Sequence, residues 1–166
     1  MPAGGTLREP PDVLLALDAG VRETGWAVLF RQGAPKTGVI QLRARPRVPA
    51  ATRVCQLVRR LDQLVQEWEP TETAYSQPSG IHWPVPALEL LENALTAWSQ
   101  RHRLPLYPYS AQQVRSAIVG HPNASRDRLA YEVMVRFGLI GQGKTTHEWE
   151  ALAVGHYHLT VHVRSP

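Results

Sequence analysis

The sequence predicts an α/β domain, a mixed five-stranded sheet flanked by helices. Apolar runs with strand-like spacing open the chain, and longer segments further on repeat apolar side chains every three or four positions. Strands and helices then alternate, as in other sheets that are covered by helices. The length of 166 residues suits one domain. We therefore expect a flexible lead-in over residues 1–11 and a single domain over 12–163.

Three strands are predicted first. The stretch "LLALD" is apolar up to Asp18, Gly20 begins a turn, and apolar residues resume from Gly25. "KTGVIQLRA" follows the turn "RQGAP" as a third strand. "TETAYSQ" and "LPLYPY" are the fourth and fifth, and the prolines of the last favour a sheet edge or a strand end.

Five helices complete the pattern. Apolar residues at helical spacing predict an amphipathic helix over 50–69, which Pro70 ends. A second helix is expected in "VPALELLENALTAWSQRH". Ser110 and Ser125 are placed to cap two shorter helices, which glycines stop. The closing helix is expected to begin near Thr146.

Composition limits the function classes. The net charge is +4, with sixteen arginines and two lysines, which favours anionic partners such as nucleic acid. Codon usage would explain the arginine excess equally well. No apolar run is long enough to span a bilayer, and the N-terminus lacks the pattern of a signal peptide. Cys55, the only cysteine, excludes an internal disulfide, so we expect a cytoplasmic protein without a membrane partner.

A few polar residues stand where chemistry could be built. Asp18 ends an apolar strand, where a carboxylate is costly to desolvate unless a cation or hydrogen-bond donors compensate it. It is either a turn-forming aspartate or a metal ligand. His147 and Glu150 lie three apart, on one helix face. They would bind Mg²⁺ or Mn²⁺ if strand and helix meet, and otherwise serve as capping or solvent-facing residues.

Three separated segments resemble RuvC-type Holliday junction resolvases. In "LLALDAGVRETGWAVL", Asp18, Gly20 and the Thr24–Gly25 pair keep the pattern of the family's first strand pair, with Ala19 replacing the usual proline. "YSAQQVRSAIVGHPNASRDRLAYEV" and "THEWEALAVGHYH" are similar to two later segments of the family. The resemblance runs over residues 13–158, with the elements in the right order.

The resemblance implies a ribonuclease H-like fold and an Mg²⁺-dependent (or Mn²⁺-dependent) endonuclease that nicks four-way DNA junctions by two-metal phosphodiester hydrolysis. It also implies a homodimer, and a branch-migration helicase as a partner. Asp18 and Glu150 take the positions of catalytic, metal-binding acids, and His147 takes one where members of the family use Asp or His. Arg115 and Arg126 take the positions of lysines near the scissile phosphate. Exposed helix charges are the alternative for both arginines.

The chain departs from the family at two positions. The second catalytic acid is replaced by Ser76, whose neutral hydroxyl is a poor bridge between two metal ions. Glu72 shares a strand face with Ser76 but lies roughly 13 Å away along the strand, and either Glu89 or Glu92 would have to reach in from the next helix to replace the acid.

Ser79 stands at the DNA-contacting position where the family has an aromatic residue that wedges into DNA. His82 and Trp83 are nearby aromatic side chains that could stack instead, although simple packing explains Trp83 as well. Three histidines near the C-terminus are interpreted as a polar helix face rather than a metal site: His156, His158 and His162.

Two functions remain open from the sequence. The first is an active, metal-dependent DNA endonuclease, which Asp18, His147 and Glu150 favour. The second is a catalytically impaired protein that binds branched DNA without cutting it, which Ser76 favours. A small-molecule or protein-interaction module on the same fold is a more distant third.

Overall fold

The computed structural model describes residues 9–20, 22–42, 48–77 and 86–164, with side chains up to residue 161. The predicted DNA contact at Ser79 and the role of Trp83 fall outside these residues. Most of the predicted lead-in does too, so its flexibility stays a prediction. At its end, the Pro10 carbonyl accepts a hydrogen bond of 2.8 Å from Arg31.

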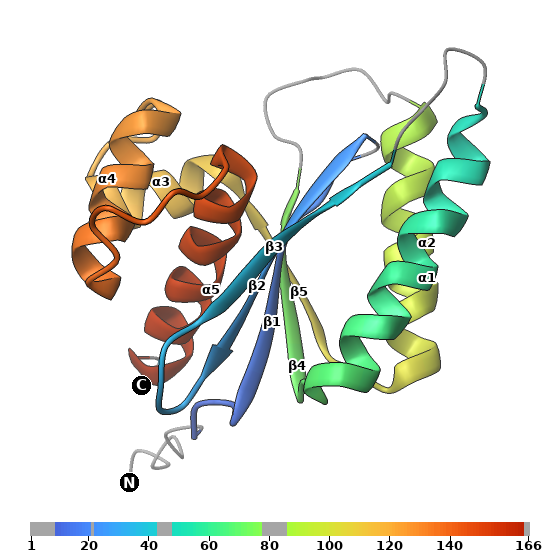
Figure 1. Ribbon diagram of the computed structural model, residues 1–166, viewed down its shortest axis with the longest axis horizontal. Helices are drawn as coiled ribbons and strands as arrows, with labels where there is room; N and C mark the ends of the chain where they lie inside the picture. Colours follow the sequence, from blue (N-terminus) through green and yellow to red (C-terminus); the bar gives the residue numbers. More distant parts are fainter. Residues whose placement is uncertain (1–8, 21, 43–47, 78–85, 165–166) are drawn as a thin grey trace, which may run out of the picture.

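The five predicted strands form one mixed sheet in the order β3-β2-β1-β4-β5 (Figure 1). The first three strands pair antiparallel, whereas β4 and β5 run parallel to β1. The proline-containing strand β5 lies at the sheet edge, as expected. The strands are β1 (Val13–Asp18), β2 (Glu23–Phe30), β3 (Lys36–Gln41), β4 (Glu72–Gln77) and β5 (Leu106–Ser110).

Helices cover both faces of the sheet, so the predicted α/β architecture is confirmed (Figure 1). One face carries α1 (Ala50–Trp68) and α2 (Pro86–His102). The other carries α3 (Ala111–Val119), α4 (Arg126–Phe137) and α5 (Thr146–Arg164). None of the described helices is long and apolar enough to cross a lipid bilayer.

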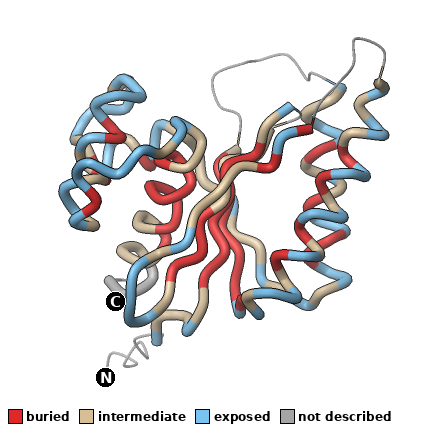
Figure 2. Tube along the Cα trace, viewed as in Figure 1, coloured by how far each residue is buried: buried red, intermediate tan, exposed pale blue. Residues whose placement is uncertain are grey.

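The alternation of side chains along β1 decides which face the candidate site uses. Leu15 and Leu17 pack toward α1 and α2, whereas Leu14 and Ala16 pack toward α5. Because successive side chains of a strand point to opposite faces, Asp18 falls on the α5 side. Figure 2 shows the buried central strands that fix this orientation.

The helix boundaries follow the predicted caps. The Ser110 side chain accepts a hydrogen bond from the Gln113 backbone N–H, and the Gln113 side chain accepts one from the Ser110 N–H. Ser125 caps α4 with one bond, in which its hydroxyl accepts from the Arg128 backbone N–H. These caps fix the starts of α3 and α4, which carry Arg115 and Arg126.

The interpretation of the C-terminal histidines as a polar helix face is wrong for His158, which is fully buried. Its Nε2 lies 2.9 Å from the Glu72 carboxylate, and its Nδ1 lies 2.7 Å from the Tyr109 hydroxyl. These hydrogen bonds offset the cost of burying an imidazole. The side chain of His162 lies outside the described residues.

Helix α5 approaches the β1–β2 hairpin closely because glycines stand at the contacts. A Cβ added at Gly25 would come within 2.1 Å of the His147 carbonyl oxygen. One added to Gly155 of α5 would come within 2.5 Å of a Leu29 methyl group. The Gly25 contact is backbone against backbone, so no side-chain rotation relieves it. Gly25 therefore sets the distance between β2 and the start of α5.

We predict that Gly25→Ala lowers the free energy of unfolding by on the order of 1–3 kcal/mol, because the added methyl group must push α5 away from the sheet. Urea denaturation followed by circular dichroism measures the change. The matched control is Gly143→Ala, since a Cβ there meets nothing within 4 Å. Equal unfolding midpoints for the two variants would contradict the close approach.

Candidate active site

The candidate site begins at the turn that follows β1. Asp18, the last residue of the strand, pairs with Gly25 in the antiparallel register. The buried Thr24 hydroxyl donates to the Gly20 carbonyl at 3.1 Å and accepts from the Gly20 N–H at 3.2 Å. This two-way contact holds the ends of the turn together, which explains the threonine at position 24.

Asp18 meets the start of α5, as the sequence requires of a metal site. Its Oδ2 lies 2.8 Å from Nδ1 of His147, and Nε2 of the same ring lies 2.9 Å from Oε2 of Glu23. The contact between strand and helix is therefore confirmed, although 128 residues separate Asp18 from Thr146. Glu23 was not predicted. The alternation of Ala27 and Leu29 toward α5 would have placed it on this face.

His147 is held by carboxylates on both ring nitrogens. The hydrogen bond to Asp18 raises the pKa of the imidazole above its usual value; burial opposes this shift, and the charges of Asp18 and Glu23 add to it. In its charged form the ring donates from both nitrogens and has no lone pair for a metal. Its predicted role as a metal ligand stays a prediction and requires the loss of that proton.

Glu150 faces an arginine from α3. Its Oε1 lies 2.5 Å from Nη2 of Arg115, and its Oε2 accepts a longer bond of 3.4 Å from Nη1. The Arg115 Nε also donates to the Ala124 carbonyl at 3.0 Å. Burial raises the pKa of the Glu150 carboxyl, Arg115 opposes the shift, and the nearby Asp18 carboxylate adds to it. Arg115 is therefore not the exposed helix charge that the sequence left as an alternative.

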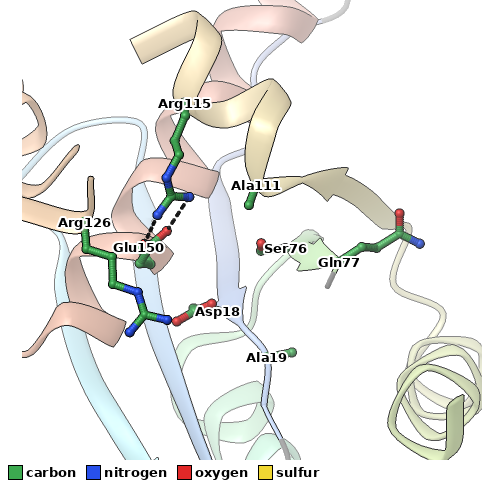
Figure 3. A pocket seen from close by; sticks show the side chains of 8 residues that line it. All are labelled: Asp18, Ala19, Ser76, Gln77, Ala111, Arg115, Arg126 and Glu150. Atoms are coloured by element: carbon green, nitrogen blue, oxygen red, sulfur yellow. Dashed lines mark hydrogen bonds and ion pairs between the residues drawn. The ribbon is translucent and has the colours of Figure 1, made fainter. Parts of the chain in front are cut away.

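The two acids share one pocket of about 220 Å³ (Figure 3). Asp18 comes from β1, Ser76 from β4, and Glu150 from α5, so the predicted positions of the family acids do converge. Asp18 and Glu150 supply two negative charges, and Arg115 with Arg126 supplies two positive ones. The complete lining is Asp18, Ala19, Ser76, Gln77, Ala111, Arg115, Arg126 and Glu150.

The charge balance corrects one expectation. The metal site that the sequence predicts where strand and helix meet calls for a negatively charged lining, whereas the formal charges of this lining cancel. Three of the four charges come from helices, those of Arg115, Arg126 and Glu150. The spacing of residues in the sequence did not reveal that Arg115 contacts Glu150. Glu72, Glu89 and Glu92 do not line the pocket, so none of them supplies the acid that the family resemblance implies at position 76.

Arg126 differs from Arg115 in its surroundings. It begins α4, is exposed, and makes no ion pair with any residue that the structure describes. Figure 3 shows its side chain extending into the pocket from the α4 side, toward Asp18. The pKa values of Glu150 and His147 are both raised overall, and the positive charge of Arg126 opposes part of each rise. This guanidinium is therefore the one in the pocket that is available to an incoming anion.

The donors fit a hard divalent ion only in part. Carboxylate oxygens of Asp18 and Glu150 and the Ser76 hydroxyl suit Mg²⁺ or Mn²⁺, and Mg²⁺ commonly uses one or two carboxylates with water and substrate phosphates. No group of three or more His, Cys, Asp or Glu side chains among the described residues could hold a metal by itself. The set therefore fits one ion whose shell is completed by water and phosphate.

The pKa of His147 predicts a pH-dependent contribution to stability. A raised pKa in the folded state means that the stabilisation is complete below the usual value of 6.5 and is lost as the pH rises through the raised value. We expect His147→Gln to lower the free energy of unfolding by on the order of 1 kcal/mol near pH 5.5 and by less near pH 9. Urea denaturation in the presence of a chelator measures both. Equal losses at the two pH values would contradict the charged contact.

Comparison with known proteins places this site in a family. The family model described as "Crossover junction endodeoxyribonuclease RuvC" matches residues 14–158. Curated proteins of that name are 29% identical in Neisseria meningitidis, over 77% of this chain and 74% of the relative, and 29% identical in Chlorobium phaeovibrioides, over 86% and 78%.

Solved structures agree with the predicted ribonuclease H-like fold. Thermus thermophilus RuvC in complex with a Holliday junction substrate superimposes with a TM-score of 0.75 at 22% identity, covering 88% of this chain and 92% of that one. The yeast mitochondrial Holliday junction resolvase gives a TM-score of 0.64 at 12% identity, covering 96% and 83%. At these identities the likeness concerns the fold alone. The family match, in contrast, spans most of the sequence, and the chain accordingly belongs to the crossover junction endodeoxyribonuclease RuvC family.

Proposed function

We propose that this protein is a divalent-metal-dependent endonuclease that nicks four-way DNA junctions and serves DNA recombination and repair. The proposal rests most on one observation: Asp18 and Glu150, from opposite ends of a RuvC-family chain, meet in one pocket beside an available guanidinium. Related proteins carry the endonuclease name, and one of them is described with a Holliday junction substrate.

Four residues of the pocket, with His147 beside them, would take part in this function. Asp18 and Glu150 would hold the ion, Mg²⁺ or Mn²⁺. A bound divalent ion would supply positive charge at the scissile phosphate and lower the pKa of water. Arg126 would bind a phosphate oxygen of the backbone, since guanidinium and phosphate form strong charge-assisted hydrogen bonds. The Ser76 hydroxyl can donate to the same phosphate, and His147 holds the Asp18 carboxylate in place.

The partners in this proposal follow the resemblance. A homodimer with twofold symmetry matches the symmetry of a four-way junction, because each chain then presents one pocket to one of two equivalent strands. A branch-migration helicase would supply the junction, and the cytoplasm would be the place of action.

The first test of the function is cleavage of a synthetic four-way junction. We expect the wild-type protein to nick it with Mg²⁺ or Mn²⁺ and Asp18→Asn to cut at least about 100-fold more slowly, since the variant loses charge stabilisation worth about 3 kcal/mol in the transition state. Junction affinity should change little. Gel analysis of labelled strands measures the nicking rate.

Asp62→Asn is the matched control, because Asp62 lies on α1 and pairs with Arg101 and His102 away from the pocket. It should cut like the wild type. Equal rates for Asp18→Asn and the wild type would remove the pocket from the reaction.

A second candidate function is the binding of branched DNA without cutting. Ser76 in place of an acid and the ion pair that engages Glu150 both favour it. The same assay decides between the two: tight junction binding with no nicking in either metal would select the binding protein.

Arg126 is predicted to contact phosphate. Arg126→Ala should weaken junction binding and reduce the slope of log affinity against log salt by about one, because one fewer counterion is released. Arg128→Ala is the matched control, since Arg128 is exposed on the same helix but pairs with Glu132 and does not line the pocket. Fluorescence anisotropy over a salt series measures both. An unchanged slope in Arg126→Ala would place this residue off the DNA path.

A further inference from the structure

We propose that the pocket takes one divalent ion per chain, held by Asp18 and Glu150, and that the Arg115 guanidinium is a built-in second cation. The inference rests on the proposed function, because it says how the same pocket is charged. It concerns this chain's departure at Ser76 and the contacts of Arg115.

Arg115 is fixed rather than mobile. Its guanidinium contacts both oxygens of Glu150, and its Nε donates to the Ala124 carbonyl between α3 and α4. The side chain is only 12% exposed, as is that of Glu150. A buried charge held on both sides in this way is costly to displace, because its partner would be left uncompensated. Arg115 is therefore a permanent positive charge of the pocket, in contrast to the exposed Arg126.

Ser76 lines the same pocket. It is 8% exposed, and its hydroxyl makes no hydrogen bond with any residue that the structure describes. The Ser76 Oγ is not among the buried polar atoms that lack a partner, so the hydroxyl opens to the pocket and can bind water, phosphate or an ion there. Being neutral, however, it adds no charge to the pocket.

The charges of the lining allow one ion and oppose two. Asp18 and Glu150 together offset the charge of a single divalent ion, and Arg115 already offsets part of Glu150. A second divalent ion would face a fixed guanidinium with no further carboxylate to hold it. Glu150 can still bind the first divalent ion through Oε2. This oxygen accepts only the long hydrogen bond of 3.4 Å, and a carboxylate oxygen can accept at more than one position.

The test counts ions directly. Binding of Mn²⁺ to the full chain is measured without DNA. The electron paramagnetic resonance signal of free Mn²⁺ decreases as the ion binds, and this decrease reports the number of ions bound. We expect wild type and Ser76→Ala to saturate at one ion per chain. Ser76→Glu, which restores a carboxylate, should bind a second ion or bind the first on the order of tenfold more tightly.

Arg115→Gln tests the guanidinium. Removing its charge should tighten Mn²⁺ binding on the order of tenfold, because Glu150 is then unopposed. The matched control is Arg136→Gln: Arg136 also joins two helices, through the Ile118 carbonyl, but does not line the pocket. Circular dichroism confirms that each variant is folded. If Arg115→Gln does not fold, the comparison of wild type, Ser76→Ala and Ser76→Glu still decides the count.

Each outcome bears on one proposal at a time. Two ions in the wild type, none at millimolar Mn²⁺, or a folded Arg115→Gln with unchanged affinity would overturn the inference. Because the count uses no DNA, a wild type that binds one ion but ignores junctions would overturn the proposed function and leave this inference standing.

Discussion

The contact between the start of α5 and the β1–β2 hairpin is the constraint on which the site depends. Backbone meets backbone there, because Gly25 has no side chain to hold His147 away. The same contact turns the Asp18 carboxylate toward α5 and carries Glu150, one helical turn beyond His147, into the pocket. The first strand of the chain and its last helix thus supply one acid each. Packing at two glycines is what makes a site out of residues distant in sequence.

The charged side chains that this packing brings together must compensate one another's charges. His147 bridges Asp18 and Glu23, and Arg115 pairs with Glu150, so each of these three acids has a basic partner from another element. At the start of β4, the buried Glu72 pairs with His158 and does not line the pocket. The α5 side of the sheet therefore carries two separate polar groups, one at the carboxyl end of β1 and one under β5. The group at the carboxyl end of β1 lines a pocket.

The sequence predicted the elements well because each depends on local rules. An apolar period of two placed the strands, and one of three to four placed the helices. The serine and glycine caps set the ends of α3 and α4. The meeting of Asp18 with α5 was predicted through the family resemblance. The partners of the charged groups were not, because helical spacing gives the face of Arg115 but not the residue opposite it. His158 was misjudged for the same reason: an imidazole near a helix end resembles surface until its partners on β4 and β5 are known.

The family fixes the fold, whereas the chemistry depends on the particular side chains at its end. At position 76 the chain has a neutral serine where the resemblance implies an acid, and Arg115 holds a positive charge against Glu150. These two features support each other. A third carboxylate beside the half-buried Asp18 and the buried Glu150 would require an additional cation. With a neutral residue at 76, the guanidinium that pairs with Glu150 already provides compensation. The neutral residue at 76 is therefore compatible with a stable pocket, and what distinguishes this chain is how few additional positive charges that pocket can accept.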